Sequence, residues 1–205
     1  MLTASFVNVA GSDKGIDLYD LVAGGTYSAG DITVQTLNSD GTANKIYTYM
    51  KPRRGDTWFW QDLLTSETIA EGSVVFKPGQ GLWISGVDGA QLTNSGAVST
   101  DDNAIALCNG FVATGNMTPV AIDLTSLVAG GTYSAGDITV QTLNSDGTAN
   151  KIYTFMKPRR GDTWFWQDLL TSETIAEGDV TFAPGQGLWI SGVDGATLTF
   201  PGPTL

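Results

Sequence analysis

The sequence predicts an all-β protein made of two tandem, near-identical β-sandwich or jelly-roll-like domains. Short segments alternate apolar and polar residues, turn-forming residues separate them, and one long block is repeated. The chain has 205 residues, of which 26 are glycine. Charged residues make up only 15% of the chain. Exposed helices are normally rich in Glu, Lys and Arg, so this composition favours strands and turns.

The internal repeat dominates the chain. Ile16–Thr93 aligns without a gap with Ile122–Thr199, and 7 of these 78 positions differ. The expected boundaries are a first domain over 1–99, a linker over 100–104 and a second domain over 105–205. A period of about 100 residues fits whole domains better than a solenoid, whose repeats span about 20–50 residues. Core, turn and surface residues are all retained alike, which indicates copying of a domain and not selection on a site.

The first copy divides into about seven short strands. Asp31–Leu37 and Lys45–Met50 alternate apolar and polar residues around the turn Asn38–Gly41, which predicts a hairpin. A second hairpin is expected from Ser73–Phe76 and Leu82–Ser85. Further short strands are predicted over Ser5–Val9, Ile16–Val22 and Gln91–Thr93. The expected core includes Val34, Ile46, Val74, Phe76, Trp83 and Ile84, or their alternating neighbours.

Only Gln61–Glu71 is a helix candidate. Its apolar spacing is poor and it is rich in Thr and Ser, so a loop with a single helical turn fits the segment equally well.

Composition excludes several classes of function. A net charge of −11 disfavours nucleic acid and anionic membranes as partners. The chain has no His and one Cys, Cys108, which removes the usual general base and the common zinc ligands. No cofactor or metal is therefore expected, and Cys108 is predicted to be a small buried residue in a strand. No stretch reaches the ~20 apolar residues of a membrane helix, and the beginning of the sequence has no secretory signal pattern.

The stretch KPRRGDTWFWQD occurs at Lys51–Asp62 and again at Lys157–Asp168. Pro52 favours an extended, projecting loop that exposes the charges after it. Strand alternation places Trp58 and Trp60 on one face, and the sequence leaves open whether that face is solvent or core. The candidate contact surface consists of Arg53, Arg54, Trp58, Trp60, Arg159, Arg160, Trp164 and Trp166.

Several interpretations of this stretch remain open. The tryptophans can complete the core, form a protein contact, or stack on a glycan. The tripeptide Arg54-Gly55-Asp56 matches an integrin motif, but an ordinary turn explains it equally well. Asp56, Asp62, Glu67 and Glu71 could supply the paired carboxylates of a glycosidase. Nothing else in the sequence supports catalysis, so no catalytic residue and no enzyme activity are predicted.

Three motifs of the second copy carry a resemblance. They are TGNMTP at Thr114–Pro119, FAPGQGLW at Phe182–Trp189 and FPGPTL at Phe200–Leu205. The chain thereby resembles tandem β-domain proteins encoded by gut bacteria and by their phages or prophages. The first copy keeps Phe76–Trp83 but has Asn94 where the second has Phe200, and it lacks the TGN opening.

The resemblance implies a non-enzymatic structural protein of a bacteriophage virion, such as a capsid decoration or head-appendage protein. Its expected partners are capsid or other virion proteins and further copies of itself in a homo-oligomer. The expected location is the virion surface, after synthesis in the host cytoplasm. The alternative function is a carbohydrate-binding module that uses the tryptophan-rich loops for surface adhesion.

Overall fold

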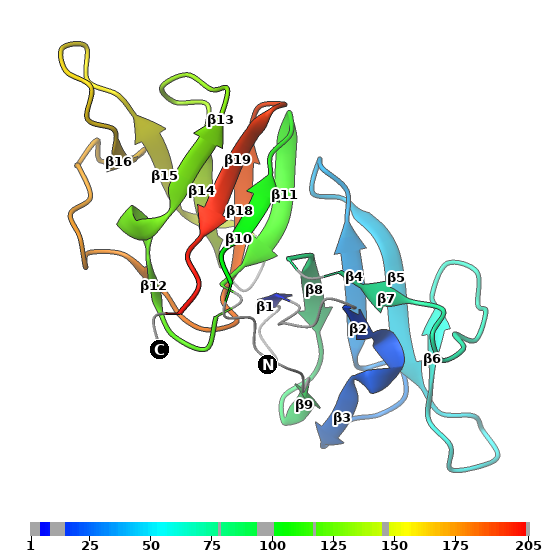
Figure 1. Ribbon diagram of the computed structural model, residues 1–205. Helices are drawn as coiled ribbons and strands as arrows, with labels where there is room; N and C mark the ends of the chain where they lie inside the picture. The colour runs from blue at the N-terminus through cyan, green and yellow to red at the C-terminus, as the bar shows by residue number, and fades with distance from the viewer. Residues whose placement is uncertain are drawn as a thin grey trace.

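The computed structural model shows an all-β protein, as the sequence predicts (Figure 1). It describes residues 5–8, 15–77, 79–93, 101–116, 118–144 and 148–203. Among these residues the only helical elements are two 3-10 turns, η1 (Leu18–Asp20) and η2 (Leu124–Ser126). We call the described residues up to Thr93 the first half and those from Asp101 the second half. The structure leaves the expected domain boundaries as predictions, and β10 (Asn103–Ala106) begins within the expected linker.

Each half contains one antiparallel five-stranded sheet with the same strand order. In the first half the order is β1-β8-β4-β5-β6, and in the second it is β11-β18-β14-β15-β16. The first sheet consists of β1 (Ser5–Asn8), β8 (Gly81–Ser85), β4 (Thr33–Leu37), β5 (Ala43–Met50) and β6 (Phe59–Asp62). The second consists of β11 (Gly110–Gly115), β18 (Gly187–Gly192), β14 (Thr139–Leu143), β15 (Ala149–Met156) and β16 (Phe165–Asp168).

Smaller sheets form the second layer of each half. In the first half they are the pairs β2 (Ile16–Asp17) with β7 (Val75–Phe76) and β3 (Val22–Gly25) with β9 (Ala90–Thr93). Their counterparts are β12 (Ile122–Asp123) with β17 (Thr181–Phe182) and β13 (Val128–Gly131) with β19 (Ala196–Phe200). In the second half β10 adds a third strand on the free side of β19.

The apolar core of each half lies between its two layers, as in a sandwich. In the first half Val34, Trp60 and Ile84 of the large sheet pack with Leu18 and Phe76 of the other layer. The expected core residues Val34, Phe76 and Ile84 are confirmed as buried. Ile46, Val74 and Trp83 are only partly buried, and the neighbours that alternation places on the other face, such as Tyr47 and Leu82, are buried.

Three local predictions are wrong. Ile16–Val22 is not one strand, because the Asp17 side chain accepts a hydrogen bond from the Tyr19 N–H and begins η1. The hairpin expected from Ser73–Phe76 and Leu82–Ser85 does not form, because β7 pairs with β2 whereas β8 pairs with β1 and β4. Of the two alternatives left open for Gln61–Glu71, the helix does not form, and the last residues of β6 lead into a turn. Cys108 is half-buried and lies in the connection between β10 and β11, outside any strand.

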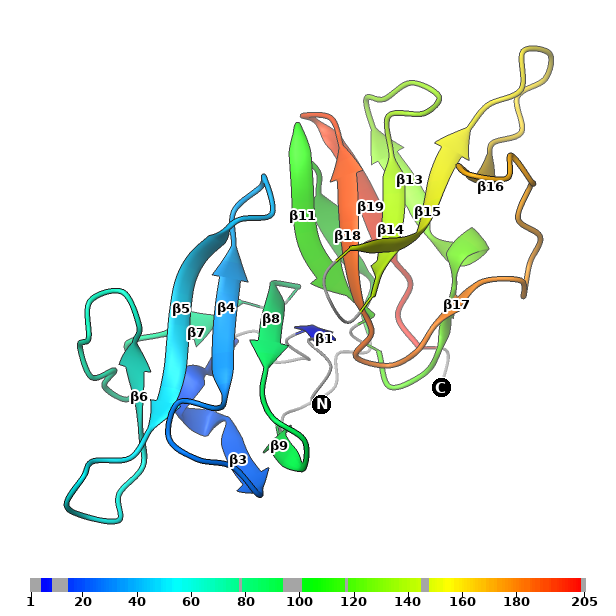
Figure 2. The same ribbon diagram turned by 180° about the vertical axis from the view of Figure 1, so that it is seen from behind.

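The two halves meet through equivalent strands. β1 and β8 of the first half contact β11 and β18 of the second, and Figures 1 and 2 show β1 and β11 facing each other at the centre. β1 is the counterpart of β11, and β8 is the counterpart of β18. Each half therefore uses the same two strands in the contact. The contact is therefore self-complementary, as in a two-fold symmetric dimer.

Glycines allow the halves to approach closely. The Phe111 N–H donates to the Ser39 carbonyl at 2.7 Å, in the loop between β4 and β5. A Cβ at Gly41 would lie 2.2 Å from the Trp189 indole, and one at Gly81 would lie 2.5 Å from the Ala113 carbonyl carbon. Any side chain at these positions would push the halves apart.

Candidate interaction surface

The loop between β5 and β6 carries the predicted arginines. Arg53 and Arg54 are exposed, as are Arg159 and Arg160 in the second half. Lys51 Nζ pairs with Asp56 Oδ1 at 2.9 Å, and the Asp56 side chain is almost fully exposed. The hydrogen bond from Lys51 and its charge lower the pKa of Asp56. The aspartate of the Arg-Gly-Asp tripeptide is therefore bonded to a lysine of its own loop.

The structure separates the two predicted tryptophans. Trp60 and Trp166 are 2% exposed and lie in the core, so they contribute nothing to a surface. Trp58 is half-buried at the sheet edge, where its indole stacks on Tyr49 with ring centroids 5.1 Å apart. Lys51 Nζ lies 5.9 Å from the centre of the same indole. Trp164 repeats this arrangement on Phe155 and Lys157.

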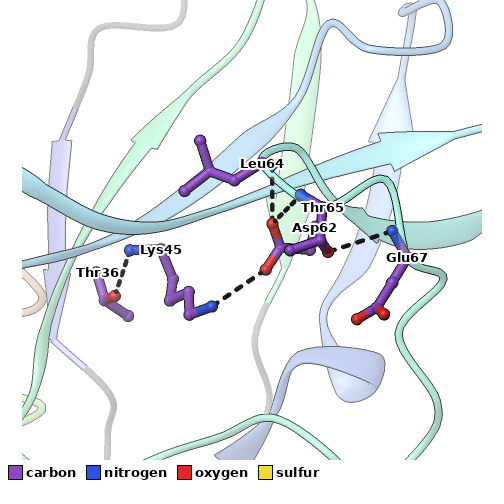
Figure 3. A network of polar contacts seen from close by, with 6 residues as sticks. All are labelled: Thr36, Lys45, Asp62, Leu64, Thr65 and Glu67. Atoms are coloured by element: carbon purple, nitrogen blue, oxygen red, sulfur yellow. Dashed lines mark hydrogen bonds and ion pairs between the residues drawn. The ribbon is translucent and has the colours of Figure 1, made fainter.

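The turn that follows β6 is organised by the carboxylate of Asp62 (Figure 3). Asp62 Oδ1 accepts from the Leu64 N–H at 2.8 Å and from the Thr65 N–H at 3.1 Å. Its backbone accepts from the Ser66 N–H at 2.8 Å and donates to the Glu67 carbonyl at 2.9 Å. Asp168 makes the same bonds in the second half. Side-chain and backbone bonds thus fix one conformation of this turn.

Electrostatics keep the Asp62 side chain ionised. Burial raises its pKa, but the two backbone donors and the nearby Lys45 outweigh burial, and the pKa of Asp62 lies below its usual value. Lys45 Nζ is 3.5 Å from Asp62 Oδ2. A glycosidase needs one carboxylic acid with a raised pKa to protonate its leaving group. Asp62 and its counterpart Asp168 have the opposite property.

The fixed turn exposes two adjacent leucines in each half. Leu63 and Leu64 are 53% and 65% exposed, and Leu169 and Leu170 are 53% and 69% exposed. We call each pair, Leu63–Leu64 and Leu169–Leu170, a dileucine turn. The Leu63 N–H donates to the Ile46 carbonyl at 2.8 Å, which ties the turn to β5. Ser66 adopts a φ of 62°, a left-handed conformation that is unfavourable for a residue other than glycine.

The dileucine turns were not predicted from the sequence, because Gln61–Glu71 fits either a helix or a loop with a single helical turn. A signal was present in the adjacency of Leu63 and Leu64. Neighbouring residues of an extended segment point to opposite sides, so a sheet edge cannot bury both of them.

The dileucine turns lie far from the contact between the halves. Each one follows the edge strand of a five-stranded sheet, β6 or β16. Figures 1 and 2 show these strands at the two outer sides of the molecule, away from β1 and β11. One chain therefore presents two nearly identical dileucine turns on opposite sides.

The described residues provide no candidate for a metal site or for a membrane-spanning helix. No cluster of three or more metal-ligating side chains occurs among them, and none of their helices could cross a membrane. Comparison of the chain with protein-family models, with curated proteins and with solved structures finds no match.

Proposed function

We propose that this chain is a non-enzymatic structural protein of a bacteriophage particle, in the manner of a capsid decoration or head-appendage protein. One observation carries the proposal: each half holds a hydrogen-bonded turn that exposes two leucines on the outer side of the molecule. Contiguous apolar side chains that stay exposed on the surface mark sites of protein contact. The assignment to a phage particle rests on the sequence motifs at Thr114–Pro119, Phe182–Trp189 and Phe200–Leu205.

The duplicated geometry suits a repeating protein surface. Two equal contact regions on one chain can bind two equal sites of a lattice, and joint binding raises the apparent affinity without new contacts. The exposed arginines of the neighbouring loops, Arg53, Arg54, Arg159 and Arg160, can pair with acidic groups of the partner. The partners would be capsid or other virion proteins, or further copies of the chain.

Mass spectrometry of purified particles tests the assignment. We expect the chain in particles isolated from the host that carries its gene, and its absence from them contradicts the proposal. The dileucine turns are tested separately by replacing Leu63, Leu64, Leu169 and Leu170 with Ser. This variant should fold normally but no longer sediment with the particles.

Val22 and Val128 supply the matched control. They are exposed apolar residues on β3 and β13, with 64% and 61% of their surface accessible. The variant in which both are Ser should sediment with the particles like the wild type. If both variants are released alike, the dileucine turns are not the contact.

A carbohydrate-binding module is the second candidate. The half-buried Trp58 and Trp164 favour it, because an indole at a surface can stack on a sugar ring. However, Tyr49 covers one face of Trp58 and the Lys51 ammonium lies over the same ring. A glycan array with the wild type and a Trp58→Ala, Trp164→Ala variant separates the two functions, since binding by the wild type alone would support the module.

A further inference from the structure

The two halves differ in one edge of their small sheets. In the second half β10 pairs with β19, with Ile105 opposite Leu198 and Ala104 opposite Thr199. The Leu107 N–H extends this pairing by donating to the Ala196 carbonyl at 2.9 Å. In the first half β9 is the counterpart of β19, and the described residues provide no strand on the corresponding side of β9.

The sequences of the two edges are nearly the same. β9 reads Ala-Gln-Leu-Thr, and the first four residues of β19 read Ala-Thr-Leu-Thr. Neither tetrapeptide contains Pro or a charged residue, two common means by which natural proteins block an edge. The β9 edge therefore has the chemistry that accepts a strand in the second half.

Burial shows what the extra strand contributes. Leu198, next to β10 in the same sheet, is 0% exposed, whereas its counterpart Leu92 is only partly buried. Ile190 is 0% exposed and its counterpart Ile84 is 7% exposed. Ile105 and Leu107 close the core of the second half, and no described residue takes their place in the first.

The edge strands of the two large sheets, β1 and β6 or β11 and β16, differ from β9 because each has further contacts. β6 and β16 carry additional bridges, Gln61 to Thr68 and Gln167 to Thr174. β1 and β11 face each other at the centre of the molecule. Among the described residues, β9 is the edge at which one half has a partner strand and the other does not.

We propose that the β9 edge binds an extended segment of another protein by strand addition, in the register that β10 uses on β19. The segment carries large aliphatic side chains at alternate positions, as Ile105 and Leu107 do, and small residues between them, as Ala104 and Ala106 do. Main-chain hydrogen bonds provide affinity and the aliphatic side chains cover Leu92. A second copy is not the donor, because its own β10 is already paired with β19.

This inference does not depend on the phage particle proposed above. The probe is a synthetic peptide of residues 101–109 with Cys108→Ser, added to the full chain. Hydrogen exchange followed by mass spectrometry reports the protection of Ala90–Thr93. Peptide at about ten times its Kd should slow exchange there about tenfold, because binding lowers the open population in that proportion.

Matched variants distinguish strand addition from other binding. A peptide with Ile105→Asp and Leu107→Asp should give no protection. In the chain, Leu92→Asp should abolish binding, whereas Val22→Asp adds the same charge to an exposed residue of the same sheet and should leave binding intact. If Leu92→Asp impairs folding, the peptide pair alone decides.

Four outcomes would overturn the proposal. One is no change of exchange at β9 with the peptide, and another is protection changes at β19 instead. Protection of β9 in the chain alone, at all protein concentrations, would show that the chain's own residues cover the edge. Protection that rises with protein concentration would identify a second copy as the occupant.

Discussion

Asp62 stabilises its turn through an ionised carboxylate that is buried but fully bonded. Two backbone N–H groups and Lys45 surround it, and its own backbone closes the turn through Ser66 and Glu67. Hydrogen bonds to a charged group contribute more than bonds between neutral groups. One residue therefore sets both the stability of the turn and the exposure of Leu63 and Leu64.

Replacing Asp62 with Ala should lower the free energy of unfolding by about 2 kcal/mol, because two backbone donors lose a charged acceptor. Asp62→Asn should cost less, since an amide oxygen can accept the same two bonds. Urea unfolding of the two variants measures the difference, and hydrogen exchange at Leu64 and Thr65 should accelerate mainly in the Ala variant. Equal stability of the Ala variant and the wild type would contradict this role.

Acid should destabilise the protein through Asp62 and Asp168. Their pKa values lie below the ordinary value in the folded chain, so both residues favour the folded state at pH values above about 4, the unfolded pKa. This contribution declines as the pH falls from there through the folded pKa. Urea midpoints between pH 3 and 6 should fall with acid. The Asp62→Asn, Asp168→Asn variant should show a shallower decline, and an unchanged slope would exclude these residues as the cause.

At the scale of elements, the sequence predicted strands that depend on local alternation. The hairpin of β4 and β5 follows from the pattern over Asp31–Met50, and the turn between them holds Gly41 at a φ of 82°. The sequence could not predict that β8 lies between β1 and β4, because those pairings join residues far apart in the chain. It also missed the break after Asp17, since an aspartate that caps a turn fits the polar position of an alternating strand.

The candidate site was also predicted only in part, because its local patterns are visible in the sequence and its contacts with distant residues are not. Proline and charge correctly indicated an exposed loop with Arg53 and Arg54. Alternation placed Trp58 and Trp60 on one face, but the strand begins only at Phe59, so the two indoles differ in burial. Which face of an edge strand is buried depends on the second layer, and that information is not local.

Packing between the halves gives a prediction for one strand residue. Gly81→Ala should cost about 1–3 kcal/mol, as overpacking does, because the new methyl group would meet the Ala113 carbonyl. Gly24→Ala is the control, since its Cβ would have only the flexible end of Gln91 at 4.0 Å. Thermal or urea unfolding measures both variants, and hydrogen exchange at β11 should rise only in Gly81→Ala. Equal effects of the two substitutions would contradict the close approach of the halves.

At the scale of the whole molecule, the two halves place equivalent strands against each other. Strands β1, β8, β11 and β18 are used up within the chain, so they cannot serve a further copy in the same way. Higher assembly must use other surfaces. The dileucine turns and the β9 edge both lie outside this contact.

The last prediction is that one chain binds a particle through both of its dileucine turns. If both dileucine turns bind one particle, removal of Leu63 and Leu64 alone should weaken particle binding by about 10²–10⁴-fold, because the second attachment becomes intramolecular once the first has formed. Removal of Leu169 and Leu170 alone should have the same effect, since the turns are nearly identical. Sedimentation of labelled chain with particles over a range of concentrations measures the affinity of the wild type and of each single-half variant.

If the two single-half variants bind as tightly as the wild type while the variant that lacks all four leucines does not bind, each chain engages the particle through only one turn. If one single-half variant is unaffected and the other abolishes binding, the halves have different roles despite their near-identity.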